Sequence, residues 1–297
     1  MRTIEGFLNI SKPYDWTSHD VVQLVRRLTG IRRVGHAGTL DPAAVGVLVV
    51  AVGRATRLLD YLSGQDKAYC GDIVLGASTD TDDAVGTVLQ VSDPSGIDLG
   101  QVATALRCFL GEIEQLPPQY SAIKLQGKKA YELARKGEKV TLTPRRVTIK
   151  SMAIVGWEPP TVSVVVLCSK GTYIRSLARD LGEKLGVGGH LGALVRFASG
   201  PFSLDDAVGI EDLRLAAEFG YLDKLVLPAD IAVAHFPAII VTDENARAML
   251  GGRRWPVRAA SAPDGPVRVF SSEGKFLGLA IAVEGKWQPK LVLAEEQ

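Results

Sequence analysis

The sequence predicts an α+β fold in two parts: a large part that intersperses helices with strands, and a small β-rich part at the C-terminal end. Runs rich in β-branched residues at 48–52 and 161–169 are typical of buried strands. Apolar residues recur at helical spacing over 21–30 and 171–186. From about residue 235 onward, short strand-like runs alternate with glycine turns, which indicates a separate module.

The large part begins with a strand and a capped helix. GFLNISKP, residues 6–13, predicts a short strand that stops at Pro13, because proline lacks the amide hydrogen that a strand needs. The capping cluster Thr17–Asp20 precedes the helix at 21–30, and Gly30 is the glycine that commonly ends a helix. We therefore expect a strand, a turn and a helix in that order.

Residues 69–91 predict two strands joined as a hairpin by a polar connection. Within that connection, Thr79–Asp83 is similar to the start of a calcium loop. The glycine at the sixth loop position and the glutamate at the twelfth are missing, so we expect a turn and no ion site.

The remaining elements alternate along the chain. Residues 102–113 and 129–138 have helical periodicity, whereas two prolines exclude a helix from 116–124. In the C-terminal part, a strand followed by a helix is expected at 238–252, and further strands at 266–270, 274–283 and 290–295.

Composition predicts a cytoplasmic protein. The chain has 297 residues, 46% of them hydrophobic and 23% charged, which allows a sizeable core and more than one domain. Three distant cysteines, Cys70, Cys108 and Cys168, favour neither a disulfide framework nor a zinc site. No signal peptide is evident, and no run approaches the about 18 apolar residues of a membrane span. We expect no membrane association, and a monomer, since no self-association stripe is evident.

Charge is distributed unevenly, although the net charge is only +1. The segment 124–150 holds nine basic residues and two acidic ones, a balance of nine minus two, or +7. It either docks a polyanion or is the solvated face of a helix with its flanking loops, and for a lone charge run the second reading is favoured. A second basic cluster, at Arg26, Arg27, Arg32 and Arg33, modestly raises the odds of the first reading.

Signatures of metal and nucleotide binding are missing from the sequence. It contains neither a P-loop, nor G-x-G-x-x-G after a strand, nor H-E-x-x-H, and its four histidines are scattered. A reaction without metal or cofactor is therefore the default expectation.

Asp41 lies in GHAGTLDP, residues 35–42, where two glycines, a histidine and a carboxylate directly precede a core strand. Glycine lets the backbone approach a ligand closely. Spacing alone, however, favours Asp41 as a helix N-cap with Pro42 as the first helical residue.

Two further units have both a plain and a functional interpretation. Tyr173 and Arg175 follow a buried strand, where they form a tight turn or contact a base and a carboxylate or phosphate. Tyr69, in Lys67-Ala68-Tyr69, is either a half-buried sheet residue or an aromatic platform. Each signal is weak in isolation.

Together and in this order, six segments resemble the TruB family of bacterial tRNA pseudouridine-55 synthases. Six ordered segments are far more specific than one motif, and they extend over most of the chain: 6–22, 34–58, 67–86, 116–137, 168–186 and 189–202. The resemblance implies a catalytic domain at 1–235 built on a mixed, mainly antiparallel sheet with flanking helices. It also implies a small PUA-like RNA-binding β-barrel at 236–297, where the match is looser.

The resemblance also implies roles for individual residues, and it reverses the interpretation of Asp41 as a cap. Asp41 would be the catalytic carboxylate, Tyr69 would stack on the target base, and Arg175 would pair with Asp41. The other implied pocket residues are Tyr173 and Leu194, with His36 holding the turned-out nucleotide and Lys12 supporting the pocket.

The sequence departs from the family pattern at one charged position. Where the family commonly has a leucine-arginine-arginine run, this chain has Leu194-Val195-Arg196, which implies one fewer phosphate-facing cation. Within the basic segment, Lys128, Lys129, Arg145 and Arg146 are the candidates for contact with the RNA backbone.

The implied reaction isomerises uridine 55 in the T-arm of tRNA to pseudouridine, with no cofactor and no obligate protein partner. Asp41 would either attack the sugar or remove the C2′ proton to give a glycal, and the family leans toward the second. Two alternatives are an RNA-binding or RNA-folding factor without chemistry and a guide-RNA-dependent pseudouridine synthase.

Overall fold

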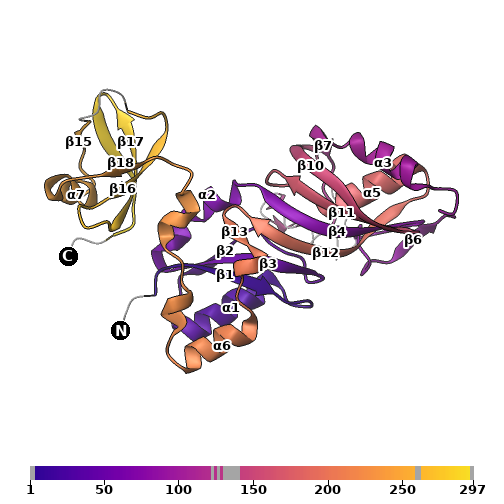
Figure 1. Ribbon diagram of the computed structural model, residues 1–297, viewed down its shortest axis with the longest axis horizontal. Coiled ribbons are helices and arrows are strands. Elements are labelled where there is room, and N and C mark those ends of the chain that lie inside the picture. Colours follow the sequence, from indigo (N-terminus) through magenta and orange to yellow (C-terminus); the bar gives the residue numbers. More distant parts are fainter. Residues whose placement is uncertain (1–3, 122–123, 126–127, 130–140, 258–261, 295–297) are drawn as a thin grey trace.

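The structure is a computed structural model that describes residues 4–121, 124–125, 128–129, 141–257 and 262–294. Figure 1 shows a long sheet with helices against it and a small module at one end of the long axis. The expected order of a large mixed part followed by a small β-rich part is confirmed.

The large sheet has the strand order β1-β3-β12-β4-β11-β10-β7, and β2 and β13 pair with β3 and β12 respectively. Only the β12–β3 pair is parallel, so the mixed, mainly antiparallel sheet expected from the family resemblance is confirmed. Its nine strands within the described residues are β1 (Gly6–Lys12), β2 (Val34–Ala37), β3 (Ala44–Val52), β4 (Lys67–Leu75), β7 (Gly111–Gln115), β10 (Arg145–Glu158), β11 (Thr161–Cys168), β12 (Gly189–Ser199) and β13 (Phe202–Ser203).

The hairpin expected at 69–91 is only partly right. The strand that begins this region, β4, pairs with β11 and β12 in the large sheet. The hairpin forms instead between two short strands, β5 (Ala77–Thr79) and β6 (Val88–Val91), with the polar Thr79–Asp83 run in its connection. A further two-stranded piece consists of β8 (Lys124–Leu125) and β9 (Lys128–Lys129).

Helix α1 (Ser18–Thr29) forms where the capping pattern predicts it. The Thr17 hydroxyl accepts a hydrogen bond from the Asp20 amide, and the Asp20 side chain accepts one from the Thr17 amide. Gly30 ends the helix with a positive φ of 68°. The helix expected at 102–113 is shorter: α3 (Leu99–Arg107) ends early because residues from Gly111 onward pair with β10. Of the helix expected at 129–138, residues 130–138 lie outside the described residues, and Lys129 is part of β9.

The helices cover the sheet in two groups, visible at opposite ends of the large part in Figure 1. Helix α1 and α6 (Ile210–Glu218) pack on β1 and β3, whereas α3 and α5 (Ile174–Leu185) pack on β4 and β11. Shorter helical turns complete this part: η1 (Gly53–Leu58), α2 (Leu59–Ser63), η2 (Leu204–Asp206), η3 (Leu222–Leu225) and η4 (Ala229–Val233). None of the helices in the described ranges is long and apolar enough to cross a membrane.

The C-terminal module is a five-stranded sheet in the order β14-β16-β17-β18-β15, with helix α7 (Asp243–Leu250) against it. Its strands are β14 (Ala238–Ile240), β15 (Trp255–Pro256), β16 (Pro266–Phe270), β17 (Phe276–Val283) and β18 (Lys286–Val292). The module has its own core, around Met249 and Trp287. It also contributes Leu279 and Leu293 to a cluster with Phe7 and Leu58 of the large part.

Main-chain contacts reinforce this attachment. The Arg54 guanidinium donates to the Leu293 carbonyl at 2.8 Å, and the Arg57 guanidinium donates to the Val292 carbonyl. The module is therefore packed against the large part as well as linked to it by the chain.

Candidate active site

The site forms where two strands share one edge of β3. Strand β1 pairs with β3 along its length, so β2 and the parallel strand β12 must use the other edge. Residues 49–52 of β3 pair with β2, and residues 44–46 pair with β12. The loop from Gly38 to Asp41 leaves the sheet where β2 gives way to β12.

Arg196, on β12, fixes this loop by hydrogen bonds from its guanidinium. Its side chain is fully buried, and its guanidinium donates to the carbonyls of Val47 at 2.7 Å, Gly38 at 3.0 Å and Thr39 at 3.5 Å. Gly38 adopts a φ of 86°, and a Cβ there would lie 3.5 Å from the Arg196 guanidinium. Such a contact is an ordinary van der Waals distance, so it is the positive φ of the turn that favours glycine here.

Other side chains fix the loop from the N-terminal elements. The Ser18 hydroxyl, at the start of α1, donates to the Leu40 carbonyl and accepts the Leu40 amide. The Lys12 ammonium donates to the Pro42 carbonyl at 3.2 Å, and the Asp15 amide donates to the same oxygen at 2.9 Å. The residues on both sides of Asp41 are thus held by a buried hydroxyl and a buried ammonium.

Asp41 is not a helix cap. Pro42 and Ala43 form a turn that leads directly into β3, so no helix begins at this position and the interpretation from spacing alone is wrong. The Asp41 carboxylate instead faces Arg175, whose Nε lies 3.0 Å from Asp41 Oδ2. The Asp41 side chain keeps 44% of its surface exposed, whereas Arg175 keeps only 6%.

Arg175 lies in the first turn of α5, and four groups fix its guanidinium. Besides Asp41, it donates to the carbonyls of Thr81 and Tyr120, both at 3.0 Å, and lies 3.7 Å from the Asp83 carboxylate. The carboxylates of Asp41 and Asp83 thus lie in different loops and face the same guanidinium. The guanidinium orientation is therefore set by the β5–β6 connection as well as by Asp41.

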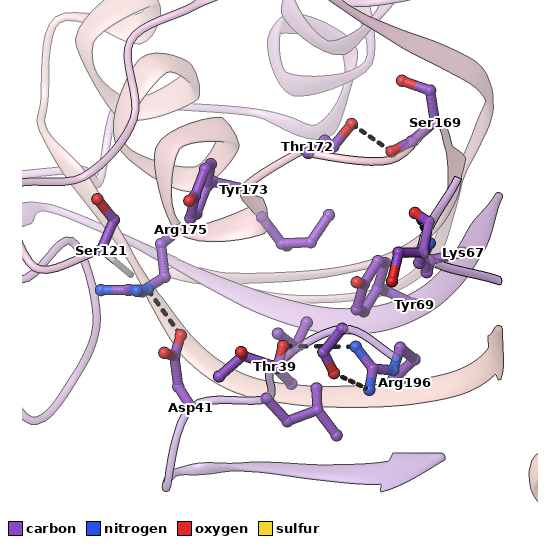
Figure 2. A pocket seen from close by; sticks show the side chains of 16 residues that line it. Thr39, Asp41, Lys67, Tyr69, Ser121, Ser169, Thr172, Tyr173, Arg175 and Arg196 are labelled. Carbon is purple, nitrogen blue, oxygen red and sulfur yellow. Dashed lines mark hydrogen bonds and ion pairs between the residues drawn. The ribbon is translucent and has the colours of Figure 1, made fainter. Parts of the chain in front are cut away.

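A pocket of about 250 Å³ opens beside this ion pair (Figure 2). Tyr69, Tyr173 and Leu194 line it together with Asp41 and Arg175. Figure 2 shows Asp41 and Arg175 pointing toward each other at one side, and Tyr69 above Arg196 at the other. Such a pocket offers a carboxylate, aromatic rings and an aliphatic side chain to a flat, partly polar ligand.

Gln115, at the end of β7, sets the position of Tyr173. Its amide oxygen accepts the Tyr173 amide at 2.8 Å, and its amide nitrogen donates to the Tyr173 carbonyl at 3.0 Å. Tyr173 precedes α5 and has no side-chain cap of its own. The paired hydrogen bonds therefore fix the strand-to-helix turn on which the tyrosine is carried.

Burial perturbs the ionisable groups of the site. Desolvation raises the pKa of Asp41, and the charge of Arg175 opposes that rise. Burial also raises the pKa of the Tyr69 and Tyr173 phenols, which keeps both neutral. Desolvation lowers the pKa of Lys67 to about 8, although its ammonium donates to the carbonyls of Ser63 and Gln65.

The sequence-predicted residues fall into two groups. Asp41, Tyr69, Tyr173, Arg175 and Leu194 all line the pocket. The side chains of Lys12 and His36 are not part of the pocket lining. Lys12 is fully buried and holds the loop, and burial lowers its pKa to about 8. His36, on β2, is half-buried, and desolvation lowers its pKa.

Of the four candidates for contact with the RNA backbone, the two whose side chains are described, Arg145 and Arg146, do not line this pocket. Arg145 and Arg146 are exposed at the start of β10, and Arg146 is 3.5 Å from Glu112 of the neighbouring strand. Lys128 and Lys129 form β9, and their side chains lie outside what the structure describes. Among the described residues, no group of three or more histidine, cysteine or acidic side chains could hold a metal ion.

Sequence reasoning missed several residues of the site. Arg196 was expected only as part of a run that faces phosphate, yet it is buried under the loop that carries Asp41. The sequence indicates only a polar turn at Asp83 and no role for Gln115, because neither residue carries a local signal. The contacts of the Asp83 carboxylate and the Thr81 carbonyl to Arg175 appear only once the hairpin and α5 meet.

Replacing Arg196 with methionine should destabilise the fold by about 3 kcal/mol, because the buried Val47 carbonyl and the partly buried carbonyls of Gly38 and Thr39 lose a charged donor. Urea unfolding of Arg196→Met and of Arg214→Met, which removes only an exposed ion pair, measures the difference. Equal midpoints for the two variants would contradict the role assigned to Arg196.

Family models match almost the entire chain. Residues 26–174 match the N-terminal domain of the TruB family of pseudouridylate synthases. Residues 175–234 match the C-terminal domain of tRNA pseudouridylate synthase B, and residues 237–293 match the C-terminal part of pseudouridine synthase II TruB.

Curated relatives agree over nearly full length. The chain is 46% identical to tRNA pseudouridine synthase B of Thermobifida fusca (strain YX), over 98% of this chain and 99% of the relative. It is 41% identical to the protein of the same name from Trichormus variabilis, over 97% of this chain and 98% of the relative.

Solved structures give the same fold. A chain in a Cbf5-Nop10-Gar1 complex matches with a TM-score of 0.76 and 26% identity, over 99% of this chain and 87% of that one. A chain in an H/ACA RNP bound to a substrate RNA containing 2′-deoxyuridine matches with a TM-score of 0.75 and 25% identity, over 98% and 86%. With the family models and the curated relatives, these matches show that the chain belongs to the TruB family of pseudouridylate synthases.

Proposed function

We propose that this protein isomerises uridine 55 in the T-arm of tRNA to pseudouridine, with Asp41 as the catalytic carboxylate. The observation that supports this best is the Asp41–Arg175 pair, 3.0 Å apart, at the side of a pocket lined by two tyrosines. The names of the 41–46% identical relatives supply the substrate class, tRNA.

The chemistry needs few groups. Uridine and pseudouridine are isomers, so the N1–C1′ bond breaks, the uracil turns, and C5 joins C1′. The proton leaves C5 and N1 gains one, so atoms and charge balance without a cofactor. Asp41 acts as its carboxylate, either by attacking C1′ or by taking the C2′ proton to give a glycal. Arg175 stabilises that anion against the desolvation of the pocket.

The other pocket residues bind the flipped base. A uridine inside a folded loop must be turned out to reach Asp41, at a cost of roughly a few kcal/mol. Stacking on Tyr69 can offset about 1–3 kcal/mol of this. Tyr173 and Leu194 complete the walls, while Lys12 acts through the loop that carries Asp41. We place His36 outside the base pocket, where it would support the displaced RNA loop.

The division of the chain follows from the same proposal. Residues 1–235 would form the catalytic domain, and 236–297 a PUA-like domain that contacts RNA. The five-stranded sheet with its own core in the second part supports this division. We further propose that the protein acts in the cytoplasm without an obligate protein partner.

Two alternatives are not favoured. A pure RNA-binding or RNA-folding factor would need no pairing between a pocket carboxylate and a buried guanidinium. A guide-RNA-dependent synthase is disfavoured because the relatives at 41–46% identity are named as tRNA enzymes, whereas the chains from H/ACA complexes are 25–26% identical.

A T-arm hairpin tests the proposal directly. The hairpin carries tritium at C5 of the target uridine, and the purified chain is added without guide RNA or other protein. Release of tritium is expected, because C5 loses its hydrogen when it joins C1′. A matched hairpin labelled at a different uridine is the control. Failure to release tritium from the target position would refute the proposed reaction.

The basic segment gives a prediction about RNA affinity. Replacing Lys128, Lys129, Arg145 and Arg146 with glutamine should weaken tRNA binding and flatten its salt dependence, because fewer counterions are released on binding. If all four contact phosphates, the slope of log K against log salt should become shallower by about 3 to 4.

Titrations of tRNA at several salt concentrations measure this slope. Replacement of Lys184 and Lys224, two exposed lysines of the large part that lie outside the basic segment, separates the effect of that segment from a general charge effect. An unchanged slope in the fourfold variant would mean that the segment is only a solvated face.

A further inference from the structure

A second hollow lies beside the Asp41–Arg175 pair. Its volume is about 60 Å³, and it shares Asp41, Arg175 and Leu194 with the first pocket. Small residues of β3 and β12, among them Ala44 and Gly192, also line it. The ion pair therefore stands between two openings, and only the first is used by the target base in the function proposed above.

Two exposed apolar side chains line this hollow. Tyr14, in the turn after β1, is 63% exposed, and Val85, in the β5–β6 connection, is 67% exposed. Large apolar side chains with this exposure contribute little to the core. When they stand together beside a site, they are candidates for ligand contact.

Both walls are held in place relative to Asp41. The turn that carries Tyr14 is attached to the catalytic loop, because the Asp15 amide donates to the Pro42 carbonyl at 2.9 Å. The connection that carries Val85 is attached to β12, because the Ala84 amide donates to the Leu191 carbonyl at 2.9 Å. The hollow is thus a formed feature and not a gap between independent loops.

We propose that this second hollow binds the base of a nucleotide directly adjacent to the target uridine, with Tyr14 as the stacking platform and Val85 as the opposite wall. This inference rests on the proposed function. Turning out the target breaks the stack of its neighbours, whose exposed faces then need a new partner. Aromatic side chains meet that need for any base, because every base has a π-face.

The charge of the hollow favours a base over a phosphate. Among the described residues that line it, Arg175 is the one cation, and it already faces Asp41 and Asp83. A phosphate would meet two carboxylates and no free cation. The small volume fits a base that lays its face on Tyr14 and brings only one edge into the hollow.

Tyrosine variants provide the first test. Tyr14→Ala should weaken binding of the T-arm hairpin about tenfold, because one stacking contact is lost. Tyr14→Phe keeps the ring and should recover most of that loss. Tyr221→Ala and Val88→Ala are matched controls, because Tyr221 is 42% exposed, Val88 is 54% exposed, and neither lines the two openings.

Modified hairpins provide the second test and identify which neighbour is bound. One hairpin lacks the base on the 5′ side of the target, and another lacks the base on the 3′ side. We expect the wild-type protein to bind one of them about tenfold more weakly, and Tyr14→Ala to lose nothing further on that same hairpin.

The proposal is overturned if Tyr14→Ala binds the intact hairpin as tightly as the two control variants do. It is also overturned if the loss caused by Tyr14→Ala persists on both modified hairpins, since the ring would then contact some other group. Tritium release by the wild-type protein from the intact hairpin is measured separately. Its failure would count against the proposed reaction, whereas the binding comparison would still decide on the second hollow.

Discussion

Asp41→Asn is expected to abolish isomerisation while tRNA affinity stays within a few-fold of the wild-type value. The amide keeps the shape of the carboxylate and can still lie beside Arg175, but it can neither attack C1′ nor accept the C2′ proton. Tritium release from a transcript labelled at C5 of uridine measures turnover, and a filter-binding titration measures affinity.

Asp206→Asn is the matched control for this experiment, since Asp206 is exposed in η2 and does not line the pocket. It should release tritium at the wild-type rate. If Asp41→Asn releases tritium at a tenth of that rate or more, Asp41 is not the catalytic carboxylate.

Arg175→Met is expected to lower kcat by about 100-fold at neutral pH, because the loop carboxylate loses the group that positions it. The substitution also leaves Asp41 and Asp83 near each other with no cation between them. Arg107→Met, at an exposed position of α3, is the matched control and should keep the wild-type rate.

The pH profile separates positioning from general loss of structure. Burial already raises the pKa of Asp41 and Arg175 opposes it, so the rate should fall on acidification as Asp41 becomes protonated. Without Arg175 the pKa of Asp41 rises further, and the acid limb should move to higher pH by about 1–3 units. A lower rate with an unshifted acid limb would show that Arg175 does not act on the ionisation of Asp41.

Local signals predicted the elements whose determinants are close in sequence. The capping box at Thr17 and Asp20 and the glycine at position 30 specify α1, and the β-branched run of β11 specifies an inner strand. The helix expected at 102–113 failed in its last residues, because pairing of β7 with β10 outweighed the apolar spacing. The hairpin predicted at 69–91 was only partly right for a similar reason, because β4 pairs with the longer strands β11 and β12 of the large sheet.

The pocket residues were named through the family resemblance and not through local pattern. Asp41 followed by proline has the same signature as a helix cap, and only the pairing of β3 with β1 and β12 excludes that helix. Arg196 and Asp83 reach the loop and Arg175 through tertiary contacts, so no window of sequence contains the signal. The supporting residues therefore emerge only from the fold.

The attachment of the C-terminal module has a consequence for how the protein can vary. The guanidinium groups of Arg54 and Arg57 donate hydrogen bonds to main-chain oxygens at the end of β18. Main-chain oxygens are present whatever side chains the strand carries. Side chains on the surface of the module can thus change without loss of these two hydrogen bonds to the large part. A substitution of either arginine would remove one of these bonds, whereas a side-chain substitution on the surface of the module would leave both acceptors in place.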